Sequence, residues 1–158
     1  MSRWNGLADR LRSADADLQG LVDRVARQLD MAQRTGDDAY LDALAFNLQR
    51  AYAAIDLVLE SIGIGFDGGL PKGPNRQYDL LRQMAAPVPG ARPGVLAEDT
   101  LAALDELRRF HDVIRYAYSL NLDTERVSQL AAGLPACMAL VRRDLETFAA
   151  FLQALDDS

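Results

Sequence analysis

The stretch LADRLRSADADLQGLVDRVARQLDMA, residues 7–32, decides the fold class. Its apolar residues recur at spacings of three and four, with charged residues between them, which is the pattern of an amphipathic helix. They are Leu7, Leu11, Ala14, Leu18, Leu21, Val25, Leu29 and Ala32. This narrow apolar seam predicts a long helix that packs nearly antiparallel to a neighbour in a bundle.

The following segment supplies that neighbour. Gly36, Asp37 and Asp38 interrupt the pattern, and an aspartate at this place is suited to cap the next helix. Residues 41–62 then carry a second apolar face, formed by Leu41, Leu44, Leu48, Ala51, Ile55, Val58 and Ile62. Each helix of about 25 residues would be roughly 38 Å long.

Further helices are predicted along the rest of the chain, over residues 76–86, 97–119, 124–132 and 134–155. In the first of these, Tyr78 and Leu81 are expected to face inward. Gly133 is expected to end the short helix before it, and Pro135 suits the first turn of the last helix. No alternating strand pattern occurs, so residues 1–158 are expected to form a single all-α domain, a helical bundle of four long and two shorter helices.

The segment between residues 63 and 75 is rich in glycine and proline and should not be helical. It resembles a phosphate-binding loop only superficially, because no strand precedes it and the Gly-Lys-Ser/Thr ending is missing. A mobile loop beside a binding site is the better interpretation.

Composition limits the possible functions. The 158 residues carry a net charge of −6, so a broad basic face for nucleic acid is excluded and any such site must be local. No apolar run approaches the length of a membrane span. Cys137 is the only cysteine and lies in an apolar context, which suggests inert packing and a cytoplasmic protein.

Residues 107–118, LRRFHDVIRYAY, contain the only histidine of the chain. On a helix, residues three and four apart share a face, so Arg108, His111, Arg115 and Tyr118 form one stripe with Asp112 beside it. Tyr52 and Tyr78, by contrast, are interpreted as ordinary bundle aromatics.

This stripe suits metal-independent cleavage of a phosphodiester. Histidine is the side-chain type whose unperturbed pKa lies near neutrality, so His111 is suited to move a proton, while Arg115 can hold the phosphate. Asp112 opposes this interpretation if it forms an ion pair with Arg108 or Arg115. A histidine at an ordinary surface or interface position is the alternative. One histidine and one cysteine offer no metal-ligand set, so no metal and no cofactor are expected.

Three stretches carry a family resemblance: NRQYDLLRQM (residues 75–84), PVPGARPGVL (87–96) and LRRFHDVIRYAYSLNLDTER (107–126). With the order of helices, they resemble HepT-like proteins of the HEPN superfamily from about residue 35 onward. The resemblance implies an all-α bundle, a homodimer, and a ribonuclease toxin that acts on RNA. It also implies neutralisation by a small nucleotidyltransferase antitoxin as partner.

The family signature is an arginine, four residues, a histidine, one residue and a tyrosine. Aligned on Tyr118, this chain has His111 in place of the arginine and Tyr116 in place of the histidine. The resemblance therefore implies that His111, Arg115 and Tyr118 form a rearranged catalytic group, with Tyr118 also the residue modified by the partner. Arg108 and Arg109 would bind the RNA substrate. The alternative is a catalytically inactive HEPN-like bundle that serves dimerisation or partner binding.

Overall fold

The computed structural model describes residues 3–116 and 123–158, and it gives only the backbone of Arg115 and Tyr116. These residues form the helices α1 (Asn5–Thr35), α2 (Asp38–Ile62), α3 (Arg76–Ala85), α4 (Glu98–Tyr116) and α5 (Thr124–Asp157). A π-helical turn, η1 (Gly63–Asp67), extends α2, so the expectation that the 63–75 segment is not helical is wrong for its first five residues. The described residues form no strand, only an isolated bridge between Val88 and Arg92. The predicted all-α bundle is confirmed.

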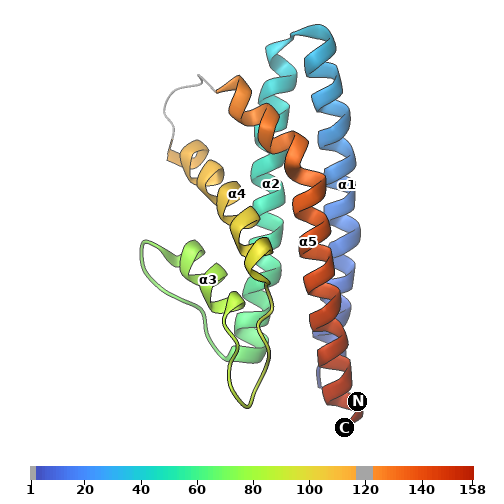
Figure 1. The fold of residues 1–158 in the computed structure, drawn as a ribbon, viewed down its shortest axis with the longest axis vertical. Helices are drawn as coiled ribbons and strands as arrows, with labels where there is room; N and C mark the ends of the chain where they lie inside the picture. Colours follow the sequence, from blue (N-terminus) through green and yellow to red (C-terminus); the bar gives the residue numbers. More distant parts are fainter. Residues whose placement is uncertain (1–2, 117–122) are drawn as a thin grey trace.

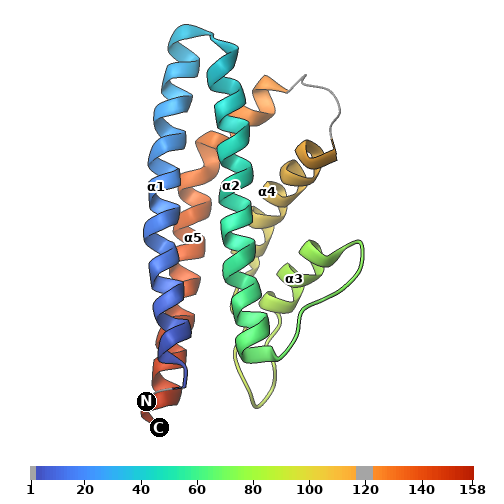
Figure 2. The ribbon, with the colours of Figure 1, turned by 180° about the vertical axis from the view of Figure 1, so that it is seen from behind.

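Three long helices, α1, α2 and α5, run side by side along the length of the molecule (Figures 1 and 2). Helix α4 crosses beside them at an angle and contacts both α2 and α5. The short α3 packs against α2 and α4 on the side away from α1. Helix α4, which carries Arg108, His111 and Asp112, therefore lies next to α2 and α3.

The turn between α1 and α2 follows the sequence signals. Gly36 has a φ of 66°, and its N–H donates to the carbonyl of Ala32. Glycine adopts this left-handed conformation without the steric cost of a side chain. Asp37 accepts a hydrogen bond from the N–H of Ala39 at 2.9 Å and so caps α2, as predicted.

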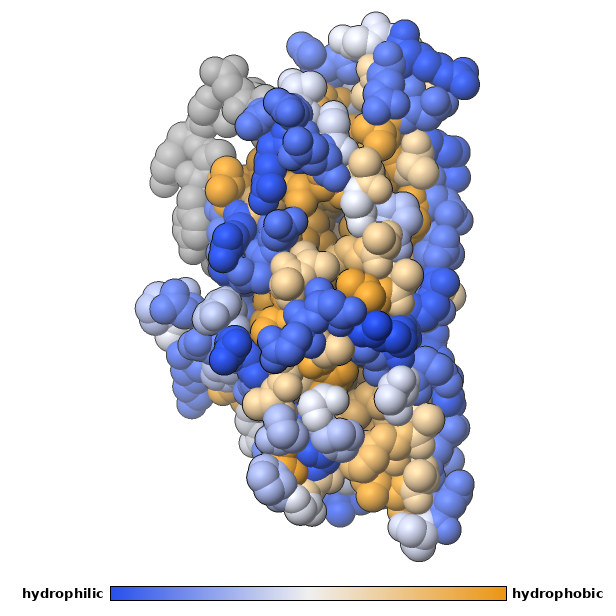
Figure 3. Space-filling model, in the orientation of Figure 1, coloured by the Kyte–Doolittle hydropathy of each residue, from blue (hydrophilic) through white to orange (hydrophobic). Residues whose placement is uncertain are grey.

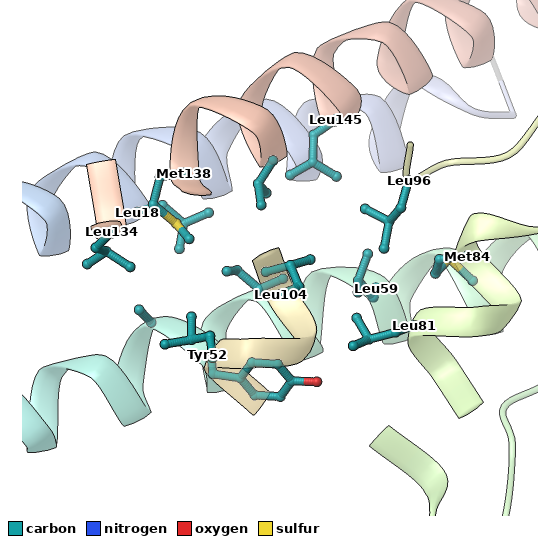
Figure 4. Packing of buried hydrophobic residues seen from close by; sticks show 14 of the residues in the cluster. Leu18, Tyr52, Leu59, Leu81, Met84, Leu96, Leu104, Leu134, Met138 and Leu145 are labelled. Carbon is teal, nitrogen blue, oxygen red and sulfur yellow. The ribbon is translucent and has the colours of Figure 1, made fainter. Parts of the chain in front are cut away.

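The core lies between α1, α2, α4 and α5, and Figure 4 shows leucines and methionines from these elements and from α3 facing one another. The seam predicted for the first helix is buried at Leu7, Leu11, Leu18 and Val25. Leu29 and Ala32, near the end of α1, are only partly buried.

Trp4 immediately precedes α1. The two ends of the chain lie close together at the lower end of the bundle in Figure 1. The ring centroid of Trp4 is 4.7 Å from that of Phe66 in η1. Its backbone N–H donates to the carboxylate of Asp156 near the end of α5, at 2.8 Å. These contacts join the start of α1 to η1 and α5.

The prediction of two separate helices after residue 123 is wrong, because α5 passes through Gly133 and Pro135 without interruption. Its buried residues Val127, Ala131, Leu134 and Met138 keep helical spacing across this point. A proline inside a helix removes one hydrogen bond and bends the axis. Figure 1 shows the first turns of α5 tilted relative to the rest, so continued core packing outweighs the local break.

Helix α3 is rotated relative to the prediction. Tyr78, expected to face inward, is 39% exposed, whereas Leu80, Leu81 and Met84 are buried. The guanidinium of Arg108 lies 5.2 Å from the centre of the Tyr78 ring. This cation–π contact holds Tyr78 toward α4 instead of in the core.

Arg92 fixes the connector between α3 and α4. Its side chain is 0% exposed and donates to both carboxylate oxygens of Asp67, at 2.7 and 2.8 Å. It also donates to the carbonyls of Gln83, Ala86 and Pro93. The burial of Asp67 alone would raise its pKa, but hydrogen bonds from Arg92 and Gln83 hold that pKa below its usual range. Asp67, in the first part of the 63–75 segment, is thereby bound to the connector between α3 and α4.

Among the helices of the described part, none combines the length and the hydropathy needed to cross a membrane.

Leu48→Ala should lower the free energy of unfolding by about 2–5 kcal/mol, because Leu48 is fully buried and its truncation leaves a cavity. Val113→Ala is the matched control on an exposed position, with 66% of the residue accessible, and should change stability by less than about 0.5 kcal/mol. Urea titration followed by circular dichroism measures both. Equal losses of unfolding free energy in the two variants would show that Leu48 does not belong to the core.

Candidate functional site

Arg108 and Arg109 of α4 are bound by carboxylates of the same helix. Arg108 contacts Asp105 at 2.8 Å and Asp112 at 2.9 Å, which is the ion pair considered from the sequence. Arg109 is 67% exposed and pairs with the other oxygen of Asp105 at 3.0 Å. These four side chains, which we call the α4 charge network, contain two cations and two anions.

His111 lies next to Asp112 of the α4 charge network, and its side chain is only 15% exposed. Its ring centroid is 5.3 Å from that of Tyr52 on α2. The imidazole Nδ1 is 3.8 Å from Asp112 Oδ1, which is too long for a hydrogen bond. His111 is thus a half-buried group at the α2–α4 contact and not a freely exposed surface residue.

Four buried polar atoms in the described structure lack a hydrogen-bond partner: Tyr52 Oη, Asp56 Oδ1, Arg76 Nη1 and His111 Nδ1. They come from α2, α3 and α4. Arg76 also donates from Nη2 to Asp56 Oδ2 at 3.2 Å and contacts Glu60. We call these five residues the inner cluster. Because buried polar groups are normally paired, a group of unpaired ones needs an explanation, and a functional role is one.

The protonation of the inner cluster reflects its burial. Burial raises the pKa of the Asp56 carboxyl above its usual range, while the positive charges of Arg76 and His111 act in the opposite direction. The pKa of Tyr52 is also raised, first by burial and then by the charge of Asp56, so its hydroxyl stays protonated. Figure 4 shows the Tyr52 hydroxyl turned away from Leu18 and Leu134, at the edge of the core.

A pocket of about 420 Å³ opens beside the cluster. It is lined by residues 73–78, Arg108 and Asp112. The end of the 63–75 segment therefore forms one wall of a pocket next to α4. Whether this loop is mobile stays a prediction.

The structure brings Arg108 and His111 to one place and leaves Arg109 on the solvent side of the α4 charge network. The side chain of Arg115 and all of Tyr118 lie outside the described residues. The sequence reasoning missed Tyr52, Asp56 and Arg76. One signal was available, since Tyr52 and Asp56 are polar residues four apart, on the same side of the predicted second helix.

Cys137 takes no part in this site. Burial raises the pKa of its thiol to about 11, which makes the reactive thiolate scarce near neutral pH. It lies against α4 in a small apolar hollow of about 190 Å³ between α4 and α5. No group of three or more potential metal ligands occurs among the residues with described side chains.

Comparison with known proteins identifies the class. The family model described as "HepT-like protein" matches residues 43–152, which is more than half of the chain and includes the inner cluster and all of α4. The chain belongs to the HepT-like protein family. No curated protein and no solved structure matches it.

Proposed function

We propose that this HepT-like protein is the toxin component of a HEPN-type toxin–antitoxin pair and cleaves RNA without a metal ion. The observation that carries the proposal is the position of His111. This single histidine is half-buried beside Asp112, which lines a pocket, and its Nδ1 is one of a group of unpaired buried polar atoms. An imidazole in such surroundings is suited to general acid–base chemistry, because it can both accept and donate a proton.

In this proposal His111 transfers the proton during cleavage of the phosphodiester bond. Arg115 stabilises the negative charge that develops on the phosphate, as a positioned arginine does. Tyr118 lines the cleft and accepts modification by the partner. Arg109, which is the more exposed arginine of the α4 charge network, supports the RNA backbone together with Arg108.

A two-fold dimer built around α4 would double these groups in one cleft, and such dimers are the commonest soluble assemblies. The proposed partner is a nucleotidyltransferase antitoxin, and the proposed location is the cytoplasm. The dimer is tested by light scattering, where a strict monomer would contradict it.

The function is tested by expressing the chain in a bacterium with and without a nucleotidyltransferase partner gene. Arrested growth and degraded RNA without the partner, and recovery with it, are the expected results. His111→Ala should abolish the arrest while the protein still folds, as measured by circular dichroism. Normal growth and intact RNA in the absence of the partner would contradict the proposal.

A catalytically inactive module that binds a partner is the second candidate, and two observations favour it. Both Arg108 and Arg109 are already neutralised by carboxylates, which weakens their attraction for phosphate. The apolar hollow between α4 and α5 offers a contact surface, and Figure 3 shows apolar residues over the middle of this face. Purified protein that binds the antitoxin but leaves RNAs of different sequence intact would support this second function.

A further inference from the structure

The outer side of α2 carries a line of exposed apolar side chains, which we call the α2 stripe. Phe46, Leu57 and Ile64 are 59%, 66% and 62% exposed, and they are three of the six large apolar residues exposed in the described part of the chain. Leu57 follows Phe46 by about three helical turns, and Ile64 follows Leu57 by about two, so the three lie on one line along α2 and the start of η1. Figure 2 shows α2 in front, between α1 and α4, with no other described element drawn over it.

A groove of about 650 Å³ runs beside the α2 stripe, between α1 and α2. Leu57 lies at this groove, and most of the other apolar residues that line it are small: Ala16, Gly20, Ala53 and Ala54. Its charged residues have both signs, with Asp17 and Arg24 on α1 and Arg50 on α2. Large exposed apolar side chains next to a groove with small walls are typical of a surface that contacts another protein molecule.

The order of residues along the α2 stripe is complementary to itself. If the α2 helix of a second copy lies antiparallel across the stripe, with residue 55 at the centre, Phe46 faces the partner's Ile64 and Ala53 faces the partner's Leu57. A small side chain is thereby placed opposite a large one.

The same alignment matches opposite charges, because Arg50 faces the partner's Glu60. Arg50 is exposed, and the side chain of Glu60 is 23% exposed while its Oε1 contacts Arg76. Both signs are present on this surface, so a partner of a single sign would meet like charges, whereas a second copy supplies both.

We propose that the α2 stripe is a two-fold interface between two copies of this chain, with the two α2 helices antiparallel. Such an interface must be self-complementary, and the alignment around residue 55 satisfies this condition. It differs from the interface around α4 in the proposed function. Tyr52, which contacts His111 of α4, lies five positions before Leu57 and so points to another side of α2. The two interfaces can therefore exist together in one assembly.

The first experiment is sedimentation analysis of the full-length protein, without RNA, over a series of concentrations. In Leu57→Glu the number of chains per particle should fall by half, because each interface then buries two carboxylates against apolar side chains. Val88→Glu is the matched control. Val88 is another exposed apolar residue, in the connector between α3 and α4, and its replacement should leave the particle unchanged. Since Leu57 is exposed, Leu57→Glu should fold as the unaltered protein does, and circular dichroism checks this.

The second experiment tests the alignment of the two helices by disulfide formation. An equal mixture of Ala53→Cys and Leu57→Cys should form a disulfide between the two chains faster than either variant alone, because these positions face each other across the interface. Cys137 contributes little, since burial raises the pKa of its thiol to about 11.

A monomeric unaltered protein, or a particle of unchanged mass in Leu57→Glu, would overturn the proposal, as expected if a different protein covers the α2 stripe. Equal disulfide formation in the mixture and in the single variants would also overturn it. The outcome is separate from that of the proposed function, because no RNA is present. Leu57→Glu leaves two chains per particle if the α4 interface exists and one chain if it does not, and both results are a fall by half.

Discussion

Arg92→Ala should lower the free energy of unfolding by about 3–5 kcal/mol, because it leaves the nearly buried carboxylate of Asp67 without its cation. It also removes the hydrogen bonds that Arg92 donates to three backbone carbonyls. Chemical denaturation at pH 7 measures the loss. The matched control is Arg34→Ala, which breaks an exposed Arg–Asp pair at 3.2 Å and should cost less than about 1 kcal/mol.

The Arg92 effect should depend on pH in a defined direction. Hydrogen bonding by Arg92 lowers the folded-state pKa of Asp67, so the pair contributes fully above the unfolded aspartate pKa of about 3.9. The contribution is lost as the pH falls through the lower folded value. The difference between Arg92→Ala and the unaltered protein should therefore shrink in acid. A loss that is the same at pH 7 and in acid would contradict an electrostatic role for the pair.

Arg115→Ala should reduce RNA cleavage on the order of 100-fold or more, since a positioned arginine stabilises charge that develops in the transition state. Arg115→Lys should restore only part of the activity, because a point charge lacks the bidentate geometry of a guanidinium. Cleavage of a labelled RNA by purified protein in EDTA is the measurement. Asp112→Ala is the comparison on the same helix and should leave cleavage unchanged or raise it, by releasing Arg108 from an ion pair.

The pH profile of that cleavage should have a limb that His111→Ala removes, because the imidazole transfers the proton. Activity that disappears in EDTA would contradict the metal-independent mechanism. Arg115→Ala protein that matches the unaltered protein would make the inactive binding module the better assignment.

The helices could be predicted from the sequence because each carries a repeated apolar face. Leu44, Leu48 and Ile55 mark the buried side of α2 in the sequence and in the structure. The continuity of α5 was not predictable in the same way, because Gly133 and Pro135 are strong local breakers. Their effect is outweighed only by contacts with helices distant in the sequence.

The site was predictable only in part. His111 and Arg108 were identified because both belong to one unusual polar segment. Asp56 and Arg76 were missed because they are recognised only by their contact with each other, which joins α2 to α3. The two residues are 20 positions apart in the chain. Helical spacing places residues on a face, but it does not tell which neighbouring helix covers that face.

Trp4 and His111 are each the only residue of their type, and they lie in different parts of the bundle. Trp4 contacts Phe66 and Asp156, whereas His111 contacts Tyr52. The chain thus carries two built-in probes, one fluorescent and one visible by NMR, that need no labelling. Denaturation curves from the two probes coincide if the bundle unfolds as one cooperative unit, and separate if the α3–α4 side melts before the α1–α5 end.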